Sequence, residues 1–278
     1  MKKRRKIKKS KKLRLKAKYR KTLSLLSILT FIIIAFIMII PKNNYKFITK
    51  EELLSLPPST LDPSLLTYGD NGIISYPQAQ LGIDLSMHQS TVDFSLLKQQ
   101  GIEFVFLRLG YRGYQSGELH LDKTFEKYYA EAKKYDLDVG VYFFSQAIDE
   151  KEAIEEANFV IKHLKNKTLD LPIAYDLEKI DYDENYRTKD LSIETKTQNA
   201  LAFCGRLLYK DYQPMIYLNQ DIANTFYDLE KIYNYDIWYA QYRSAPTYPY
   251  HYKYWQFSDK GKINGIKEEV DLNLRFHD

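Results

Sequence analysis

The feature that most constrains the fold is an alternation of apolar strand-like segments with amphipathic helical segments, which begins at Gln80. Five short apolar runs have the character of buried strands, at residues 81–86, 103–110, 138–146, 172–178 and 214–219. Apolar residues at i, i+3 and i+4 spacing, typical of helices that pack on one face, occupy the segments between them, at 92–101, 122–136, 149–167 and 193–211. Strands separated by helices predict right-handed βα units and a parallel sheet.

After Asn219 the helical pattern weakens and three further strands are predicted, at 236–242, 252–259 and 269–276. Eight strands are enough to close a barrel, and the catalytic groups of such barrels lie at the C-terminal ends of the strands. An open doubly wound sheet is the alternative, but no G-x-G-x-x-G follows the first strand. We therefore predict an α/β fold, an irregular TIM-like barrel with eight strands and about five helices, over residues 78–278.

Acidic residues stand near the ends of three predicted strands. Because side chains alternate along a strand, Asp176 and Glu178 share one face, and Asp84 and Asp271 occupy comparable positions in the first and last strands. A lone acid at a strand end is often a turn former or a helix cap. Two neighbouring carboxylates on a buried strand repel each other and lose hydration, so a purely structural role is costly. Such crowding separates the two pKa values into one neutral acid and one carboxylate, which suits hydrolysis of a glycosidic bond.

Other catalytic chemistries lack their sequence signatures. The five histidines show no H-E-x-x-H or paired spacing for zinc, and neither a G-x-S-x-G elbow nor a P-loop is present. The single cysteine, Cys204, lies in a helical segment and cannot form an internal disulfide. His88 follows the first strand closely enough either to touch a substrate or to pack. We expect no cofactor and no metal.

Aromatic residues are abundant, with 25 tyrosines, and many cluster in the late segment 236–257. The C–H faces of sugars pack against aromatic rings, and sugar hydroxyls bond to polar rims. Tyr217, Trp238, Tyr239 and Gln256 fall near predicted strand ends and are candidate sugar contacts. Ordinary packing is the alternative for each of them.

The positive charge of the chain is confined to its N-terminus. Residues 1–21 carry 14 of the 41 Lys and Arg and no acid, so the remaining 27 basic residues face all 36 acids and residues 22–278 sum to −9. A sequence pI of about 8.8 is therefore no indication that the folded part binds nucleic acid. The tail alone could contact nucleic acid or anionic lipid headgroups.

Thr22 to Ile40 forms a run of 19 residues without a charge. As a helix it would span roughly 28 Å, close to the ~30 Å hydrocarbon core of a bilayer. A cleavable signal peptide is the alternative, but its apolar region is shorter and ends in a small-residue site that this chain lacks. We predict a transmembrane signal anchor at 22–40, with tail 1–21 cytoplasmic and the rest extracellular. Turn signals at 41–77 predict an extracellular stalk.

Four motifs resemble a known family in the same order. They are "GIDLSMHQSTVDF", "VGVYFFSQA", "PIAYDLE" and the terminal "YWQFSDKGKINGIKEEVDLN". Over roughly residues 80–278 the chain is similar to glycoside hydrolase family 25, the Chalaropsis-type lysozymes. The resemblance implies an irregular eight-stranded barrel that hydrolyses the β-1,4 bond between N-acetylmuramic acid and N-acetylglucosamine in peptidoglycan.

The resemblance also implies roles for the acids. Glu178 would be the general acid that protonates the leaving oxygen. Asp176 would position the N-acetyl group of the substrate or stabilise positive charge, and Asp84 and Asp271 would line the same mouth. Retaining, substrate-assisted and inverting routes all remain open.

The resemblance extends to the substrate and to one departure from the family. Tyr217, Trp238, Tyr239 and Gln256 would be sugar contacts. Many family members have a histidine in the third strand block, where this chain has Phe143 in "VYFFSQ". We expect that change to alter the floor of a subsite.

Two other functions compete with this interpretation. A chitinase-like N-acetylhexosaminidase barrel usually carries D-x-x-D-x-D-x-E, but position 174 is alanine here. A non-catalytic wall-binding protein would have lost some of the acids, and all four are present. An enzyme anchored outside the cytoplasmic membrane would face the cell wall, which suits local wall remodelling.

Overall fold

The computed structural model describes residues 56–69 and 72–277. The predicted tail (1–21), the predicted membrane segment (22–40) and the first part of the predicted stalk (41–55) lie outside the described residues. Within the described ranges, no helix is long and apolar enough to cross a membrane.

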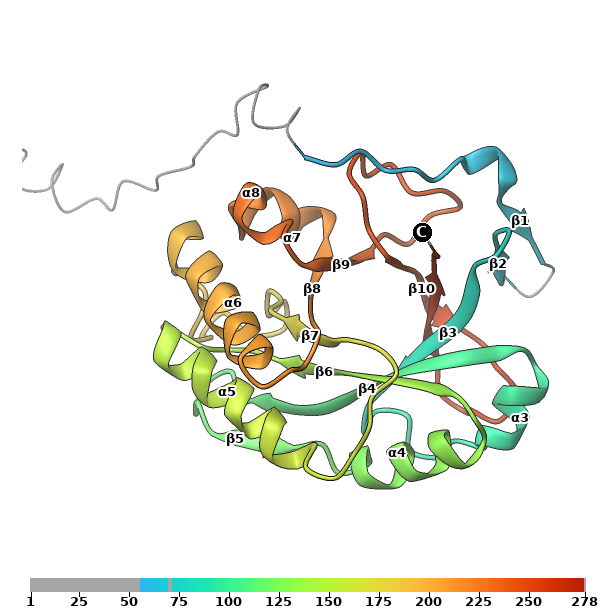
Figure 1. Ribbon diagram of the computed structural model, residues 1–278, viewed down its shortest axis with the longest axis horizontal. Helices are drawn as coiled ribbons and strands as arrows, with labels where there is room; N and C mark the ends of the chain where they lie inside the picture. The colour runs from blue at the N-terminus through green and yellow to red at the C-terminus, as the bar shows by residue number, and fades with distance from the viewer. Residues whose placement is uncertain (1–55, 70–71, 278) are drawn as a thin grey trace, which may run out of the picture. The chain divides into compact units, whose positions relative to one another are not determined.

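Eight strands close into a barrel, which confirms the predicted architecture (Figure 1). Around the barrel the strands follow the order β3-β11-β10-β9-β8-β7-β6-β4, and β4 pairs with β3 to close it. Their bounds are Gln80–Leu85 (β3), Ile102–Arg112 (β4), Asp138–Phe144 (β6), Ile173–Asp176 (β7), Pro214–Asn219 (β8), Asp236–Ala240 (β9), Tyr254–Gly261 (β10) and Val270–Arg275 (β11). A short strand, Leu119–Leu121 (β5), pairs with β4 outside the ring.

The last strand departs from the parallel sheet that the sequence predicted. β11 runs antiparallel to both of its neighbours, β10 and β3. The physical reason is the connection: residues 262–269 form a short loop without a helix, which permits an antiparallel return but no parallel crossover. The N-terminal end of β11 therefore lies at the same end of the barrel as the C-terminal ends of the parallel strands.

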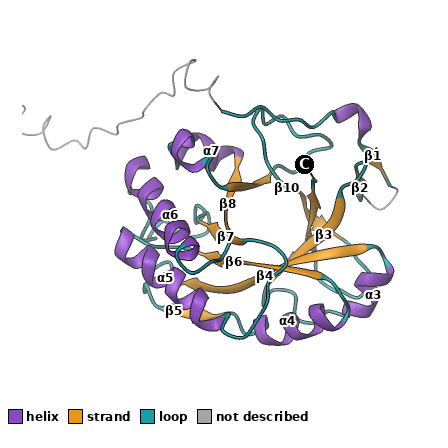
Figure 2. Cartoon of the chain, viewed as in Figure 1, coloured by secondary structure: helices purple, strands orange, loops and turns teal. Residues whose placement is uncertain are grey.

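Helices cover the outside of the barrel (Figure 2). In the described residues there are six α-helices, one more than expected: Phe94–Gln99 (α3), Phe125–Lys134 (α4), Glu150–His163 (α5), Ile193–Leu208 (α6), Gln220–Thr225 (α7) and Leu229–Ile232 (α8). Side-chain oxygens of Asp93, Asp149, Ser192 and Asn219 accept from backbone N–H groups in the first turn. These caps explain why α3, α5, α6 and α7 begin where they do.

Large aromatic side chains fill the interior of the barrel. The rings of Phe106 and Trp238 stack with their centroids 4.7 Å apart, and Phe104 lies against Phe106. Gly82 and Gly140 lie opposite these two phenylalanines, which leave no room for a Cβ at either glycine. The centre of the barrel is thus a packed core. A site is expected at the end of the barrel where the parallel strands have their C-terminal ends, which is called the upper end below.

The segment predicted as a stalk does not stand apart from the barrel where it is described. Pro58 forms a β-bridge with Tyr250, and Leu56, Leu66 and Ile74 are buried. The segment includes a 3-10 helix, Pro63–Leu65, and a small hairpin of Thr67–Tyr68 (β1) and Ile74–Ser75 (β2). The folded domain therefore includes residues 56–69 and 72–77 rather than beginning at residue 78, because the segment's apolar side chains are buried in the domain's core.

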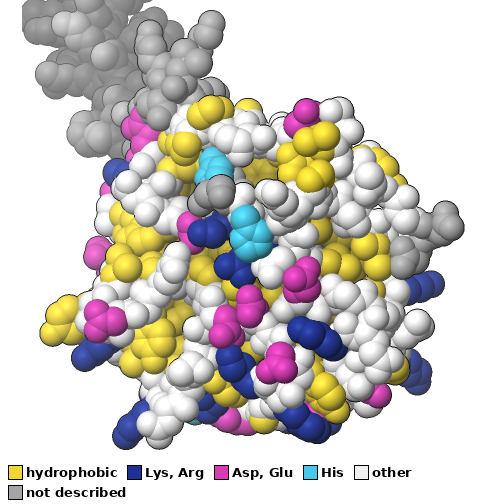
Figure 3. All heavy atoms as spheres, turned by 45° about the vertical axis from the view of Figure 1, so that its right-hand side comes forward, with side chains coloured by type: hydrophobic (Ala, Val, Ile, Leu, Met, Phe, Trp, Pro, Cys, Tyr) yellow, Lys and Arg dark blue, Asp and Glu magenta, His cyan; other side chains and the backbone are white. Residues whose placement is uncertain are grey.

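One face of the folded domain carries charged side chains of both signs. The face seen in Figure 3 carries acidic and basic side chains close together, with apolar side chains between them. This mixture agrees with the absence of a strong basic excess outside residues 1–21.

Candidate active site

Four acids meet at the upper end of the barrel. Asp84 is near the end of β3, Asp176 ends β7 and Glu178 follows two residues later. Because β11 runs antiparallel, its second residue, Asp271, pairs directly with Asp84. Burial raises the pKa of each of these acids, and the charge of at least one of the other three raises it further. The structure thus brings together all four acids predicted from the sequence, and their catalytic roles stay a prediction.

Asp84 is held by two amide side chains. Gln256 Nε2 and Asn273 Nδ2 each donate to Asp84 Oδ2 at 2.8 Å. Only 6% of Asp84 is exposed, so these donors replace water as the partners of the carboxylate. Asp84 is therefore fixed in place before any substrate binds.

A further set of donors fixes both amides. Trp238 Nε1 donates to Asn273 Oδ1 at 2.8 Å. The hydroxyls of Tyr217 and Tyr242 donate to Gln256 Oε1 at 3.1 and 3.0 Å. An indole N–H can only donate, so the oxygen of Asn273 must face Trp238 and its NH₂ must face Asp84.

Hydrogen bonding and burial separate the pKa values of the acids. Burial raises the pKa of Asp84 to about 6, against the opposing hydrogen bonds from Asn273 and Gln256. Burial, with a smaller contribution from the negative charge of Asp84, raises the pKa of Asp271 to about 9. Asp84 is therefore the more easily ionised member of this pair.

The pKa values of the second pair of acids, Glu178 and Asp176, are also raised. Burial, followed by the charge of Asp271, raises the pKa of Glu178 to about 7. Burial and the charge of Glu178 raise the pKa of Asp176 well above its usual range, and the guanidinium of Arg108 only partly opposes this. One acid with a pKa near 7 beside a carboxylate with a pKa near 6 is an arrangement for acid–base chemistry.

Asp176 has an unused oxygen. Its Oδ1 is buried and has no hydrogen-bond partner among the residues that the structure describes. Buried polar atoms without a partner are rare in folded proteins, and at a site they indicate a group that a ligand completes. This oxygen is suited to accept an N–H from a bound molecule.

The loop that carries Glu178 is tied to the end of β6. Gln146 Nε2 approaches the backbone oxygen of Glu178 at 3.5 Å, and Gln146 Oε1 accepts from Thr188 Oγ1 at 3.0 Å. Arg187 donates to the backbone oxygen of Gln146 at 3.2 Å and to Glu152 of α5 at 2.7 Å. These contacts connect the loop after β7 to a rigid helix.

A buried ion pair holds the wall next to this loop. Arg112, in the last position of β4, donates to Glu156 of α5 at 2.8 Å, and Ser145 donates to the other oxygen of Glu156 at 2.6 Å. Burial raises the pKa of Glu156 to about 7 despite Ser145 and Arg112. The pair connects the ends of β4 and β6 to α5.

Three predicted sugar contacts are instead parts of the interior network. Tyr217, Trp238 and Gln256 are between 2 and 5% exposed, and their polar atoms bond to other protein groups. Such burial leaves little ring surface for a sugar. Their position at this end of the barrel agrees with the prediction, but their contacts orient Asp84.

Tyr239 is on the wrong side for the predicted role. Its ring stacks on Tyr248 with centroids 4.2 Å apart and also contacts Tyr252. The adjacent residue Trp238 packs against Phe106 in the barrel interior, and successive side chains of a strand face opposite ways. Tyr239 therefore packs outside the lumen and does not reach the acids.

Phe143, at the position where many family members have histidine, also faces away from the site. It packs against Phe159 of α5 and Phe203 of α6. Tyr142, its neighbour on β6, contacts Trp238 and experiences the charges of the acids, which with burial raise its pKa. Phe143 thus packs toward the outer helices, and the expected change in a subsite floor stays a prediction without a structural contact to support it.

Sequence reasoning did not select Asn273, Tyr242, Tyr142 or Arg108 as site residues. Asn273 shares a strand face with Asp271, and Tyr242 shares one with Trp238, so strand alternation was the signal available for both. Tyr242 keeps 49% of its surface exposed, which makes it a better candidate sugar contact than Tyr239.

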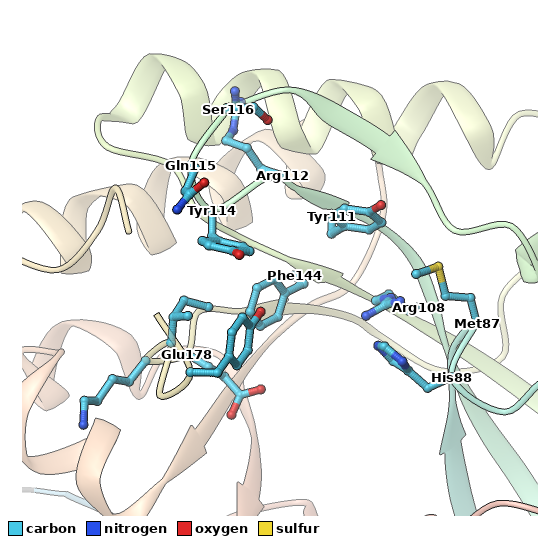
Figure 4. Close-up of a pocket in the computed structure, with 14 residues that line it drawn as sticks. Met87, His88, Arg108, Tyr111, Arg112, Tyr114, Gln115, Ser116, Phe144 and Glu178 are labelled. Carbon is cyan, nitrogen blue, oxygen red and sulfur yellow. The ribbon is translucent and has the colours of Figure 1, made fainter. Parts of the chain in front are cut away.

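A cavity of about 580 Å³ adjoins the acids and includes Glu178 in its wall. It is lined by the ends of β4 and β6 and by the loops after β3, β4 and β7, and Figure 4 shows Glu178 on one side with Arg108 and His88 on the other. His88 thus lies at the mouth, as its place after the first strand suggested. In residues 56–69 and 72–277 no group of three or more His, Cys, Asp or Glu side chains is arranged to hold a metal ion.

Comparison with known proteins gives one curated relative with clear similarity. The autolytic lysozyme of Clostridium acetobutylicum is 28% identical over 198 residues, which are 69% of this chain and 54% of the relative. The chain thus spans about half the length of that relative.

Solved structures share the fold at low sequence identity. The modular autolysin LytC from Streptococcus pneumoniae superposes with a TM-score of 0.66 at 21% identity, covering 80% of this chain and 52% of LytC. The Clostridium perfringens spore cortex lytic enzyme SleM gives a TM-score of 0.63 at 24% identity, covering 73% of this chain and 68% of SleM.

The sequence profile of glycosyl hydrolases family 25 matches residues 83–266. The matched range extends from β3 to the loop before β11 and includes three of the four acids. It covers well over half of the chain, and the family resemblance found in the sequence is confirmed. The chain belongs to family 25 of the glycosyl hydrolases.

Proposed function

We propose that the protein is a peptidoglycan hydrolase, a 1,4-β-N-acetylmuramidase that cleaves between N-acetylmuramic acid and N-acetylglucosamine. The observation that carries the proposal is the convergence of the four acids at one end of the barrel, with Glu178 in the wall of the cavity and Asp84 held by Gln256 and Asn273. Membership in the family and the 28% identity to an autolytic lysozyme support the same activity.

In the proposed reaction Glu178 donates its proton to the leaving glycosidic oxygen. A pKa near the working pH lets the group hold the proton in the ground state and release it in the transition state. Asp84, fixed by Gln256 and Asn273, stabilises the positive charge that develops on the sugar ring.

Asp176 accepts the N–H of the substrate's N-acetyl group through its unpartnered Oδ1. This contact would orient the acetamido oxygen toward the reacting carbon. Asp271, protonated at neutral pH, shares a hydrogen bond with Asp84 and lowers the pKa of Asp84. Tyr242 provides an exposed aromatic surface at the rim for the sugar.

Muropeptide mass spectrometry tests the activity directly. The purified domain, residues 56–278, is incubated with peptidoglycan beside its Glu178→Gln variant. New reducing ends on N-acetylmuramic acid, absent from the variant digest, are expected. Reducing ends on N-acetylglucosamine would assign the enzyme to the glucosaminidases, and intact wall binding without cleavage would identify a non-catalytic wall protein.

We also propose that the chain is a single-pass membrane protein that remodels nearby cell wall. The proposal rests on the uncharged run Thr22–Ile40 and the basic residues 1–21, which would lie in the cytoplasm against anionic lipid headgroups. The catalytic domain would then lie outside, facing the wall.

Cell fractionation tests the anchoring. The full chain should sediment with membranes and resist extraction by high salt, and protease added to intact protoplasts should remove the catalytic domain. Mature protein free in the culture fluid with an N-terminus after residue 40 would show that the run is cleaved instead.

A further inference from the structure

The cavity beside Glu178 contains a cationic group with an unused N–H. Arg108 Nε donates to Asp122 Oδ2 at 2.8 Å, and this oxygen also accepts from the backbone N–H of Met87 at 3.0 Å. The other oxygen of Asp122 accepts twice from Thr124. Asp122 thus holds Arg108 firmly on one side and has no capacity for a second guanidinium nitrogen.

The outer end of Arg108 is not fully satisfied by the described part of the chain. Its Nη2 is buried and forms no hydrogen bond with residues 56–69 and 72–277. The guanidinium lies over the ring of Tyr111, with Cζ 5.3 Å from the ring centroid, so its plane is supported on that side. A buried charged N–H without an acceptor is costly, and a ligand acceptor in the cavity would remove that cost.

Few charges compete for this end of Arg108. Burial and the neighbouring charge of Arg108 lower the pKa of His88, so the imidazole beside Arg108 is neutral at pH 7. Glu178 is on the opposite side of the cavity in Figure 4 and holds its proton up to about pH 7. The local field near Arg108 therefore favours an anion.

The rim of the same cavity offers aromatic surface. Tyr114 and Tyr182 form an edge-to-face pair with centroids 5.6 Å apart, and 76% of Tyr182 is exposed. Exposed tyrosine rings suit the C–H faces of a sugar. The cavity thus combines an aromatic rim, a fixed guanidinium and the proposed catalytic acid.

We propose that Arg108 is the centre of an anion-binding subsite that holds a carboxylate substituent of the glycan beside Glu178. The inference rests on the proposed muramidase function and names the feature that the site would select. In peptidoglycan the carboxylate comes either from the lactyl ether of muramic acid or from its peptide stem. A guanidinium binds a carboxylate by charge-assisted hydrogen bonds, so a neutral glycan would lose this contact.

Three glycan substrates distinguish the sources of the carboxylate. The first is glycan with peptide stems, whose carboxylates are on the stems. The second is glycan freed of its stems by an amidase, which carries free lactyl carboxylates. The third is the second substrate after conversion of its carboxylates to neutral methylamides.

We expect kcat/KM of the unmutated enzyme to be about 10- to 100-fold higher for one charged glycan than for the methylamide. A lactyl contact predicts that preference for the stripped glycan, whereas a stem contact predicts it for the stem-bearing glycan. Arg108→Gln should remove the preference, so that the ratio of kcat/KM for the charged glycan to kcat/KM for the methylamide falls to about one, whatever the overall rate of the variant. Arg206→Gln, the same change on the outer helix α6, is the matched control and should preserve the preference.

Equal kcat/KM values of the unmutated enzyme for all three substrates would overturn the subsite. This comparison needs no variant, so it decides the matter even if loss of the Asp122 pair unfolds Arg108→Gln. Hydrolysis of none of the three would instead refute the muramidase function. The subsite is then judged by NMR titration with N-acetylmuramic acid and N-acetylglucosamine, where equal affinity for the two sugars would reject it.

Discussion

Replacing Gln256 with methionine should move the acidic limb of the pH–activity profile toward higher pH. Gln256 Nε2 donates to Asp84 at 2.8 Å, and its Oε1 accepts from Tyr217 and Tyr242. Methionine has a similar volume and keeps the packing, but it provides neither the donor nor the acceptor. The substitution therefore tests the proposal that the network exists to keep Asp84 ionised.

The size of the effect follows from one charge-assisted hydrogen bond. Such a bond contributes about 1.5–3 kcal/mol, and about 1.4 kcal/mol corresponds to a tenfold change in an equilibrium. The pKa of Asp84 should therefore rise from about 6 to about 7–8. This places it at or above the pKa of Glu178, about 7, so that the productive protonation state becomes the minor one.

For independent groups, a carboxylate with a pKa of about 6 and an acid with a pKa of about 7 give roughly 60% productive enzyme near pH 6.5. With the carboxylate at about 7.5, the maximum falls to roughly 13% near pH 7.2. At pH 6 the loss is larger, roughly 15-fold. We therefore expect kcat/KM to fall moderately at the optimum, strongly at pH 6, and the optimum to move upward.

The assay is the pH dependence of kcat/KM on soluble peptidoglycan fragments between pH 4.5 and 9, because this ratio reports the ionisations of the free enzyme. Gln99→Met, on the exposed side of α3, is the matched control and should reproduce the unmutated profile. Thermal unfolding establishes that both variants are folded. An acidic limb that stays near pH 6 in folded Gln256→Met would refute the proposed function of the network.

Three further predictions concern Glu178, Tyr239 and Gly82. Glu178→Gln should lower kcat/KM by about 10²- to 10⁴-fold. Burial raises the pKa of Glu178, so the ionised carboxylate destabilises the folded state at high pH. The substitution should therefore increase the free energy of unfolding, measured in urea, by about 1–3 kcal/mol at pH 8 and leave it unchanged at pH 4. Tyr239→Phe should leave kcat/KM within about twofold, because its ring stacks on Tyr248 outside the lumen, and a larger loss would contradict that orientation. Gly82→Ala should destabilise the fold by about 1–3 kcal/mol in chemical denaturation, because Phe104 occupies the space of the new methyl group; unchanged stability would contradict this packing.

The sequence predicted the barrel and the convergence of the acids because both depend on local patterns. Alternation along a strand is a property of adjacent residues, and it places Asp176 and Glu178 on the lumen face without any knowledge of their neighbours. The same rule applied strictly would have rejected Tyr239, since Trp238 and Tyr239 are consecutive and cannot both face the lumen. That error came from choosing aromatics by their place near strand ends without asking which face of the strand each one occupies.

Other features depend on contacts that are distant in the chain. Gln256 and Asn273 reach Asp84 from 172 and 189 residues away, and no local pattern in the sequence marks them as partners. The antiparallel direction of β11 depends on how the ring closes, and it decides whether Asp271 meets Asp84 or lies at the other end of the barrel. The sequence predicts a stalk at residues 56–69 and 72–77, because turn signals do not indicate that Leu66 and Ile74 are buried in the core of the domain.

Four carboxyl groups at one end of a barrel would repel one another if all were ionised, and the pKa values show how the fold avoids this. Near pH 6.5, Asp84 carries most of the charge, because two amides donate to it, while Glu178 and Asp271 retain their protons. Burial and the charge of Glu178 raise the pKa of Asp176 well above its usual range, and its Oδ1 has no partner among the described residues. Positive charge on a bound sugar would lower the pKa of Asp176, since an opposite charge stabilises the ionised form. We therefore infer that the two aspartates differ in kind: hydrogen bonds from two amides favour the ionised form of Asp84, whereas burial disfavours the ionised form of Asp176 until positive charge develops on the sugar beside it.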